Sequence, residues 1–125
     1  MPMRGVRGAT QVGENDAEAI WAATRKLLEA ILAANPGLVM TDIASAFFTV
    51  TDDLDATYPA YAARSMGWDT VPMLCAREIP VPGGMARVVR VLLHWNTSLP
   101  QMAIHHVYLG ETASLRPDLV VLQNQ

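Results

Sequence analysis

Arginine is the residue type in this sequence with the clearest capacity for chemistry. Eight of the nine basic residues are arginine, and Lys26 is the only lysine. This bias favours recognition of planar anions, because a guanidinium presents a fork of donors that a lysine ammonium lacks. Arg90 lies within the apolar segment 88–93, which predicts a strand covered on both faces. A guanidinium there needs a carboxylate, either Glu78 in a structural ion pair or a carboxylate of a ligand.

A second arginine site lies near the start of the chain. The sequence Arg4-Gly5-Val6-Arg7-Gly8 reads as a strand, on which Arg7 shares a face with Gly5 and Ala9. A floor of small residues beside one arginine suits a bound anion. An edge strand with solvated arginines is the alternative interpretation.

Cys75 and Glu78 end another predicted strand. Cys75 shares a face with Arg77, and Glu78 lies on the other face, so both can line one pocket only if the strand ends or bulges between them. No histidine stands near Cys75 in the sequence, which favours a small buried hydrophobic residue over a nucleophile. Glu78 is open to three roles, which are a general acid or base, an acceptor for a hydroxyl, and the partner of Arg90.

The remaining polar residues do not predict a metal site. His105 and His106 are adjacent on a predicted strand and face opposite ways, His94 is isolated, and Cys75 is the only cysteine. The aspartates at 52–55 lack the rest of a calcium-loop pattern and predict a solvated turn. We therefore expect neither a metal nor a cofactor.

Composition limits the class of protein. The chain has 125 residues, 51% hydrophobic and 17% charged, a net charge of −3 and a pI near 5.5, which predicts one folded domain over residues 1–125. The acidic balance argues against nucleic-acid binding. The sequence holds neither a membrane-length apolar run nor a signal peptide, so we expect no membrane partner and a cytoplasmic location. A surface this poor in charge also suggests cover by another subunit.

Periodicity predicts the elements that would hold these side chains. An apolar stripe at steps of three and four predicts a helix over residues 16–34, with a capping box at Asn15 and Glu18. A shorter helix is expected from Pro59 to a glycine stop at Gly67. Five strands are predicted, at residues 3–10, 43–51, 70–75, 88–95 and 105–109, and residues 79–84 read as a loop. The order of elements indicates an α/β or α+β domain with a mixed sheet and helices packed on it.

With these residues in view, the sequence resembles the small monofunctional chorismate mutases of the trimeric pseudo-α/β-barrel class. The likeness runs nearly end to end. Its blocks, in order, are residues 4–10, residues 68–72, Cys75 with Glu78, Gly83-Gly84, Arg90-Val91, Pro100-Gln101, residues 106–109 and residues 115–119.

The resemblance implies a reaction and a set of site residues. The family converts chorismate to prephenate by an intramolecular Claisen rearrangement, which needs no proton transfer and no covalent intermediate. What helps such a step is binding the dianionic substrate in its compact conformer and stabilising charge on the ether oxygen. By the resemblance, Arg90 and Arg7 bind substrate, Glu78 with Cys75 meets the ring hydroxyl, and Tyr108 completes a carboxylate site.

Further residues are implied at the walls and the entrance of the pocket. They are Tyr58, Ala60, Met73 and Leu74 in the walls and Arg64, Leu115 and Arg116 at the entrance. Tyr61 stands where the best-known members have lysine, and Leu74 where they can have threonine. Family sites lie between subunits of a homotrimer, so a neighbouring copy would supply part of each site.

Two other classes of function compete with this one. Trimeric deaminases of enamine and imine intermediates have a similar architecture and also use an arginine for substrate carboxylates. A non-catalytic binding module for small carboxylates is the other alternative. Catalysed conversion of chorismate to prephenate would separate the first hypothesis from both.

Overall fold

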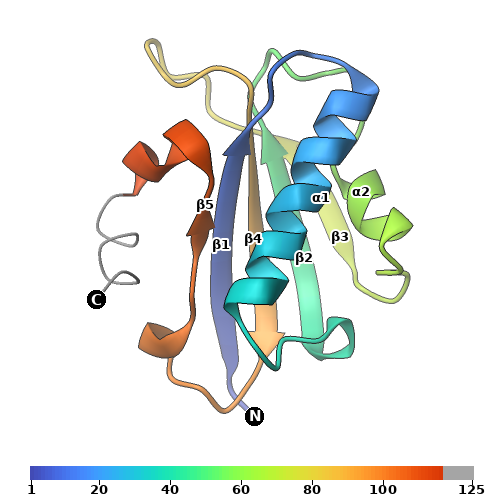
Figure 1. The fold of residues 1–125 in the computed structure, drawn as a ribbon, viewed down its shortest axis with the longest axis vertical. Helices are drawn as coiled ribbons and strands as arrows, with labels where there is room; N and C mark the ends of the chain where they lie inside the picture. Colours follow the sequence, from blue (N-terminus) through green and yellow to red (C-terminus); the bar gives the residue numbers. More distant parts are fainter. Residues whose placement is uncertain (117–125) are drawn as a thin grey trace.

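A five-stranded mixed β-sheet forms the centre of the computed structural model, which describes residues 1–116 (Figure 1). The strands are β1 (Met3–Gln11), β2 (Ile43–Val50), β3 (Met73–Arg77), β4 (Val88–Asn96) and β5 (Val107–Tyr108). The helices are α1 (Ala17–Ala34) and α2 (Ala60–Ser65), and short 3-10 turns span Met40–Asp42, Gln101–Ala103 and Gly110–Leu115. The α+β class and the mixed sheet expected from the sequence are confirmed.

The strand order is β3-β2-β4-β1-β5, so neighbours in space come from distant parts of the chain. β4 runs antiparallel to both β1 and β2, whereas the outer strands β3 and β5 run parallel to β2 and β1. Both helices cover the same face of this sheet (Figure 1). The opposite face, called here the open face, carries no helix.

The core lies between α1 and the covered face of the sheet. Leu27, Leu28 and Ile31 of α1 are fully buried against strand residues such as Phe48 and Leu93. This is the apolar stripe that the sequence predicts, and α1 starts one residue later than expected. Burial of these side chains supplies about 1.5–3 kcal/mol each.

The start of α1 differs from the predicted capping box. Asp16, not Asn15, is the N-cap, and its carboxylate accepts from the backbone N–H of Ala19. The amide of Asn15 instead reaches the 52–56 turn, where it donates to Asp55 Oδ1 and accepts from the backbone N–H groups of Asp55 and Ala56. Either Asn15 or Asp16 has a side chain suited to capping the N-terminus of α1. The contact between Asn15 and the 52–56 turn leaves Asp16 as the cap.

Two predicted strands have different limits in the structure. The expected strand 70–75 begins later, at Met73, because residues 68–71 form a turn and Pro72 has no N–H for the ladder. The expected strand 105–109 shrinks to Val107–Tyr108, since the His105 backbone N–H is taken by the side chain of Asn35. The predicted loop at 79–84 and the short helix with its glycine stop are confirmed, since α2 ends at Ser65 and Gly67 follows at φ 88°.

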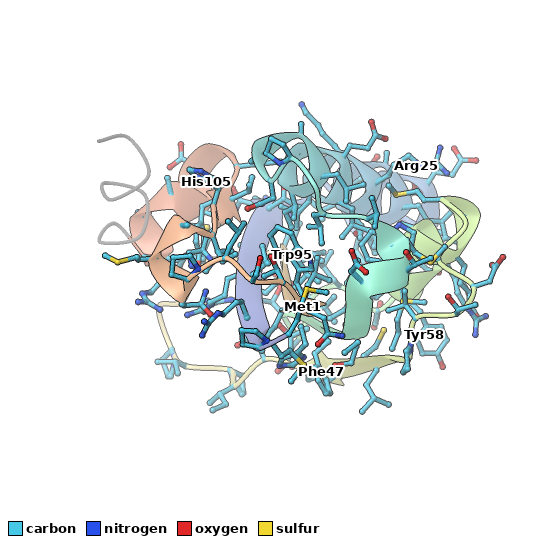
Figure 2. All side chains as sticks on the ribbon, turned by 90° about the horizontal axis from the view of Figure 1, so that it is seen from below. Met1, Arg25, Phe47, Tyr58, Trp95 and His105 are labelled. Atoms are coloured by element: carbon cyan, nitrogen blue, oxygen red, sulfur yellow. The ribbon has the colours of Figure 1, made fainter. Side chains whose placement is uncertain are left out.

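β4 is the strand for which burial was predicted wrongly. Val89, Val91, Leu93 and Trp95 are buried on the helical side. Of the alternate residues Val88 is also buried, but those from Arg90 onward remain half-buried on the open face. Figure 2 shows the two sides of the sheet, with Phe47 on the open face and Arg25 on the helical side. A strand with apolar residues on both of its faces is therefore not necessarily covered on both faces by the rest of its own chain.

None of the helices formed by residues 1–116 has the length and apolar character required to cross a membrane.

Candidate active site

Four of the residues singled out in the sequence meet in one cavity on the open face. Arg7, Glu78, Arg90 and Tyr108 line a cavity of about 410 Å³. Strand register explains the meeting, because Arg90 of β4 lies opposite Ala9 of β1, which in turn lies opposite Tyr108 of β5. Residues opposite one another project from the same face of a sheet. This open-face cavity thus collects two arginines, a carboxylate and a phenol from four segments of the chain.

Arg90 and Glu78 form a loose ion pair in this cavity. Arg90 Nε lies 3.6 Å from Glu78 Oε1, and both side chains are about 30% exposed. The hydroxyl of Thr49, opposite Arg90 in the ladder, donates to the same carboxylate oxygen. Arg90 Nε is buried and has no hydrogen-bond partner within residues 1–116. Arg90 Nε therefore faces the Glu78 carboxylate at ion-pair distance without a hydrogen bond to it, and a shift of either group or an added anionic ligand would satisfy this buried donor.

Arg7 is anchored through His106, a histidine to which the sequence assigned no role in the site. The backbone N–H of Arg7 donates to His106 Nδ1 at 2.9 Å. Burial, followed by the positive charges of Arg7 and Arg116, lowers the pKa of His106 below 6.5. A neutral ring is what this bond needs, because a protonated Nδ1 cannot accept. His106 thereby fixes β5, and with it Tyr108, against β1.

A second cavity lies at the β3 edge, between that strand and α2. Its volume is about 670 Å³. The lining contains every predicted wall residue together with Arg64 and Cys75, and also residues that the sequence did not single out. The full set is Tyr58, Ala60, Tyr61, Arg64, Trp68, Asp69, Val71, Met73, Leu74 and Cys75. This α2 cavity has Arg64 as its cation and Asp69 as its anion.

Cys75 belongs to the α2 cavity and not to the cavity of Glu78. It lies opposite Phe48 in the ladder, on the covered side of the sheet, whereas the Glu78 side chain bonds to Thr49 on the open face. The opposite facing of the two side chains follows the expected alternation. Burial raises the pKa of the Cys75 thiol above 9.0, and a backbone hydrogen bond at Ala60 opposes this only partly. The thiol is therefore protonated at neutral pH, which fits a packing or hydrogen-bonding residue better than a nucleophile.

The entrance residues of the tail lie near the open-face cavity. Leu115 lines an adjoining cavity of about 520 Å³ together with Glu78 and Arg90. Arg116 lies close enough to His106 to lower the pKa of its imidazole. Pro117 and Asp118, which belong to the same sequence block, lie outside the described residues.

The loop that leads into β4 is fastened at one strained residue. Arg87 has a positive φ of 52°, which is costly for a side chain other than glycine. Its backbone N–H donates to both carboxylate oxygens of Asp53, and its Nε donates to the carbonyl of Val12. These bonds tie the loop beside Glu78 to two other segments. The aspartate turn predicted as merely solvated thus has a structural partner.

Comparison with known proteins gives the same family from sequence and from structure. Residues 3–119 match the family model described as chorismate mutase type I. The chorismate mutase AroH of Thermus thermophilus is 52% identical over 117 residues, which are 94% of this chain and 96% of that protein. The AroH protein of Bacillus subtilis (strain 168) is 40% identical over 125 residues, covering 99% of this chain and 98% of that protein.

A solved structure of a chorismate mutase from Clostridium thermocellum superposes with a TM-score of 0.85. It is 46% identical, and the match covers 88% of this chain and 97% of that chain. Identities at this level over nearly the whole length, together with the shared sheet, leave one conclusion. The chain belongs to the type I chorismate mutase family.

Proposed function

We propose that this chain is an isomerase that converts chorismate to prephenate, without a metal, a cofactor or a covalent intermediate. The observation that carries the proposal is the open-face cavity, where Arg7 and Arg90 converge in a chain whose net charge is −3. Positive charge concentrated in one cavity of an acidic protein suits a small dianion. Family membership supplies the identity of that dianion.

The reaction explains why arginine is the useful residue. In the substrate the ether C–O bond breaks while a C–C bond forms between the side chain and the ring, and the electrons move around a closed cycle. No proton is transferred and no atom is gained or lost. The protein can accelerate such a step by holding the compact conformer and by stabilising the negative charge that grows on the ether oxygen.

Each group of the open-face cavity has a place in this scheme. Arg90 donates to the ether oxygen and to one carboxylate, with its guanidinium oriented by Glu78 at 3.6 Å. Arg7 binds a carboxylate, and Tyr108 completes that site. Glu78 accepts a hydrogen bond from the ring hydroxyl, and Cys75, which lines the α2 cavity, would contact the same hydroxyl from a neighbouring copy. A fork of donors fixed before the substrate arrives costs little reorganisation at the moment of reaction.

The α2 cavity supplies the other half of the site. Tyr58, Ala60, Met73 and Leu74 wall the substrate, with Arg64 at the entrance. Leu115 and Arg116 of the tail would reach the same entrance from the side of the open-face cavity. The two cavities share no lining residue, and Cys75 faces the helical side of the sheet while Arg90 faces the open side, which supports a site that is completed by a neighbouring copy. Phe47 and Leu74 are 40% and 65% exposed on the open face, which supports burial against a neighbouring copy. We therefore propose a homotrimer with a site at each interface.

The direct test follows the ultraviolet absorbance of chorismate after addition of purified protein. We expect the absorbance to fall at a rate proportional to protein concentration, with prephenate as the product. A rate no higher than the uncatalysed one would refute the activity. Sedimentation equilibrium tests the assembly, and a mass of one chain at micromolar concentration would refute the trimer.

Mixing two inactive variants tests whether sites are shared. Arg90→Ala disables the open-face half, and Arg64→Glu places a negative charge in the α2 half. Each variant alone should be nearly inactive. After unfolding and refolding together in equal amounts, about a quarter of the interfaces combine two intact halves, so about a quarter of wild-type activity should return. If no activity returns although mixed trimers form, both halves belong to one chain and the interface model is wrong.

A further inference from the structure

An aromatic cluster joins α1 to α2 at the rim of the α2 cavity. Tyr61 is its middle ring, with centroid separations of 6.4 Å to Trp21 and 5.4 Å to Tyr58. Both separations fall in the range of favourable aromatic contacts, and both pairs are tilted. Tyr61 is 42% exposed, yet its ring is held from two sides. The cluster therefore provides an aromatic face on the solvent-facing side of α2, opposite the buried Ala62 and Ala63.

The side chain of Arg64 lies over the ring of Tyr61. Its guanidinium carbon lies 5.5 Å from the centroid of the Tyr61 ring, within the distance of a cation–π contact. The two residues are three positions apart on α2, a spacing that places them on one side of the helix. Within residues 1–116 the Arg64 side chain makes no salt bridge and no hydrogen bond. The ring of Tyr61 is thus what orients this guanidinium.

The alternative position for Arg64 would be a pairing with the acidic group of the same cavity. Asp69 lines the α2 cavity together with Arg64 and Tyr61. An exposed arginine that paired with this carboxylate would have its donors occupied. A guanidinium held over an aromatic ring, by contrast, has no N–H group occupied by a carboxylate, so its donors are available to a ligand.

We propose that Tyr61 is a positioning residue that holds Arg64 over its ring, so that the guanidinium is ready to bind a substrate carboxylate. The inference rests on the proposed function, because it assigns Arg64 to the entrance of the chorismate site. Exposed cation–π contacts are modest, so removal of the ring should weaken substrate binding by about two- to fivefold. The entrance lies away from the reacting bonds, and the loss should therefore appear in KM with kcat nearly unchanged.

The test compares variants that remove or keep the aromatic face. Tyr61→Leu should raise KM by about two- to fivefold, whereas Tyr61→Phe keeps the ring and should rescue KM to within about twofold of wild type. Tyr61→Gln provides a second ring-free variant should leucine disturb α2. In an Arg64→Gln background, Tyr61→Leu should change KM by less than about 1.5-fold, because the group that Tyr61 positions is gone. An equal increase in KM with and without Arg64 would overturn the proposal.

A second readout does not depend on activity. The order parameter of the Arg64 Nε–H group, measured by NMR, should fall in Tyr61→Leu and stay high in Tyr61→Phe. An unchanged order parameter in Tyr61→Leu would also overturn the proposal. By contrast, a wild-type protein inert toward chorismate would refute the proposed function, and the NMR comparison would still decide whether Tyr61 orients Arg64.

Discussion

Replacement of Arg90 by alanine is the perturbation that tests the proposed chemistry most directly. Arg90 lines the open-face cavity, with Nε buried and without a hydrogen-bond partner in the described part of the chain. Arg90→Ala removes the donor fork that would meet the ether oxygen. Arg90→Lys keeps the charge but replaces the fork by a single ammonium group.

The magnitude follows from what each role of Arg90 contributes. Removal of one fixed donor to a developing oxyanion costs about 10²–10³ in rate, which corresponds to about 3–4 kcal/mol. The ion pair with Glu78, at 3.6 Å and about 30% exposed, contributes only about 0–1 kcal/mol to folding. The Glu78 carboxylate also keeps the hydrogen bond from Thr49 in the variant. Arg90→Ala should therefore lose about a hundredfold to a thousandfold in kcat/KM and only a few degrees in Tm.

The assay is the loss of chorismate absorbance, with thermal unfolding and sedimentation as checks of fold and assembly. Arg77→Ala is the matched control, since Arg77 also pairs with a carboxylate but lies 67% exposed at the end of β3. We expect Arg77→Ala to keep wild-type activity and Arg90→Lys to stay severely impaired.

Three results would refute the reasoning. Turnover of Arg90→Ala within about tenfold of wild type would show that no essential donor was removed. Near-normal activity of Arg90→Lys would show that charge alone suffices. An equal loss in Arg77→Ala would point to a general effect of positive charge on the substrate.

The other predictions concern stability and reactivity. Gly8→Ala should lower the free energy of unfolding by about 1–3 kcal/mol in a urea titration, because a Cβ there would lie 2.8 Å from Ile31 Cδ1; an unchanged midpoint would contradict this close packing. The folded pKa of His106 lies below its ordinary 6.5, so the unfolded chain binds the proton more readily and stability should fall as pH drops below about 6.5. Replacement by glutamine should reduce this pH dependence of the urea midpoint, and an identical dependence in His106→Gln would refute the assignment. Because burial raises the pKa of Cys75, iodoacetamide at pH 7.5 should modify the folded protein at least about threefold more slowly than the protein in urea, and equal rates would contradict it.

Local patterns predicted most of the secondary structure, because they depend on neighbours in the chain. The apolar stripe of α1, the run of β4 and the glycine stop after α2 all carry their own signal in residue spacing. Predictions were wrong where a distant group intervened. Asn15 bonds to the 52–56 turn and does not cap α1, and the backbone of His105 bonds to Asn35 and does not extend β5. Such competitors are remote in sequence and leave no local periodicity.

The same division holds for the site. Residue types and spacing alone indicated that Arg90 needs a carboxylate partner and that Cys75 and Glu78 face opposite ways. Resemblance added the reaction and the list of side chains. Only the tertiary structure decided their grouping, because strand order β3-β2-β4-β1-β5 brings Arg7, Arg90 and Tyr108 together from separate segments. The tertiary structure also separated these residues from the α2 cavity. The face of a strand on which a side chain lies follows from its position in the sequence, but the residues beside it across the sheet depend on how distant strands pair.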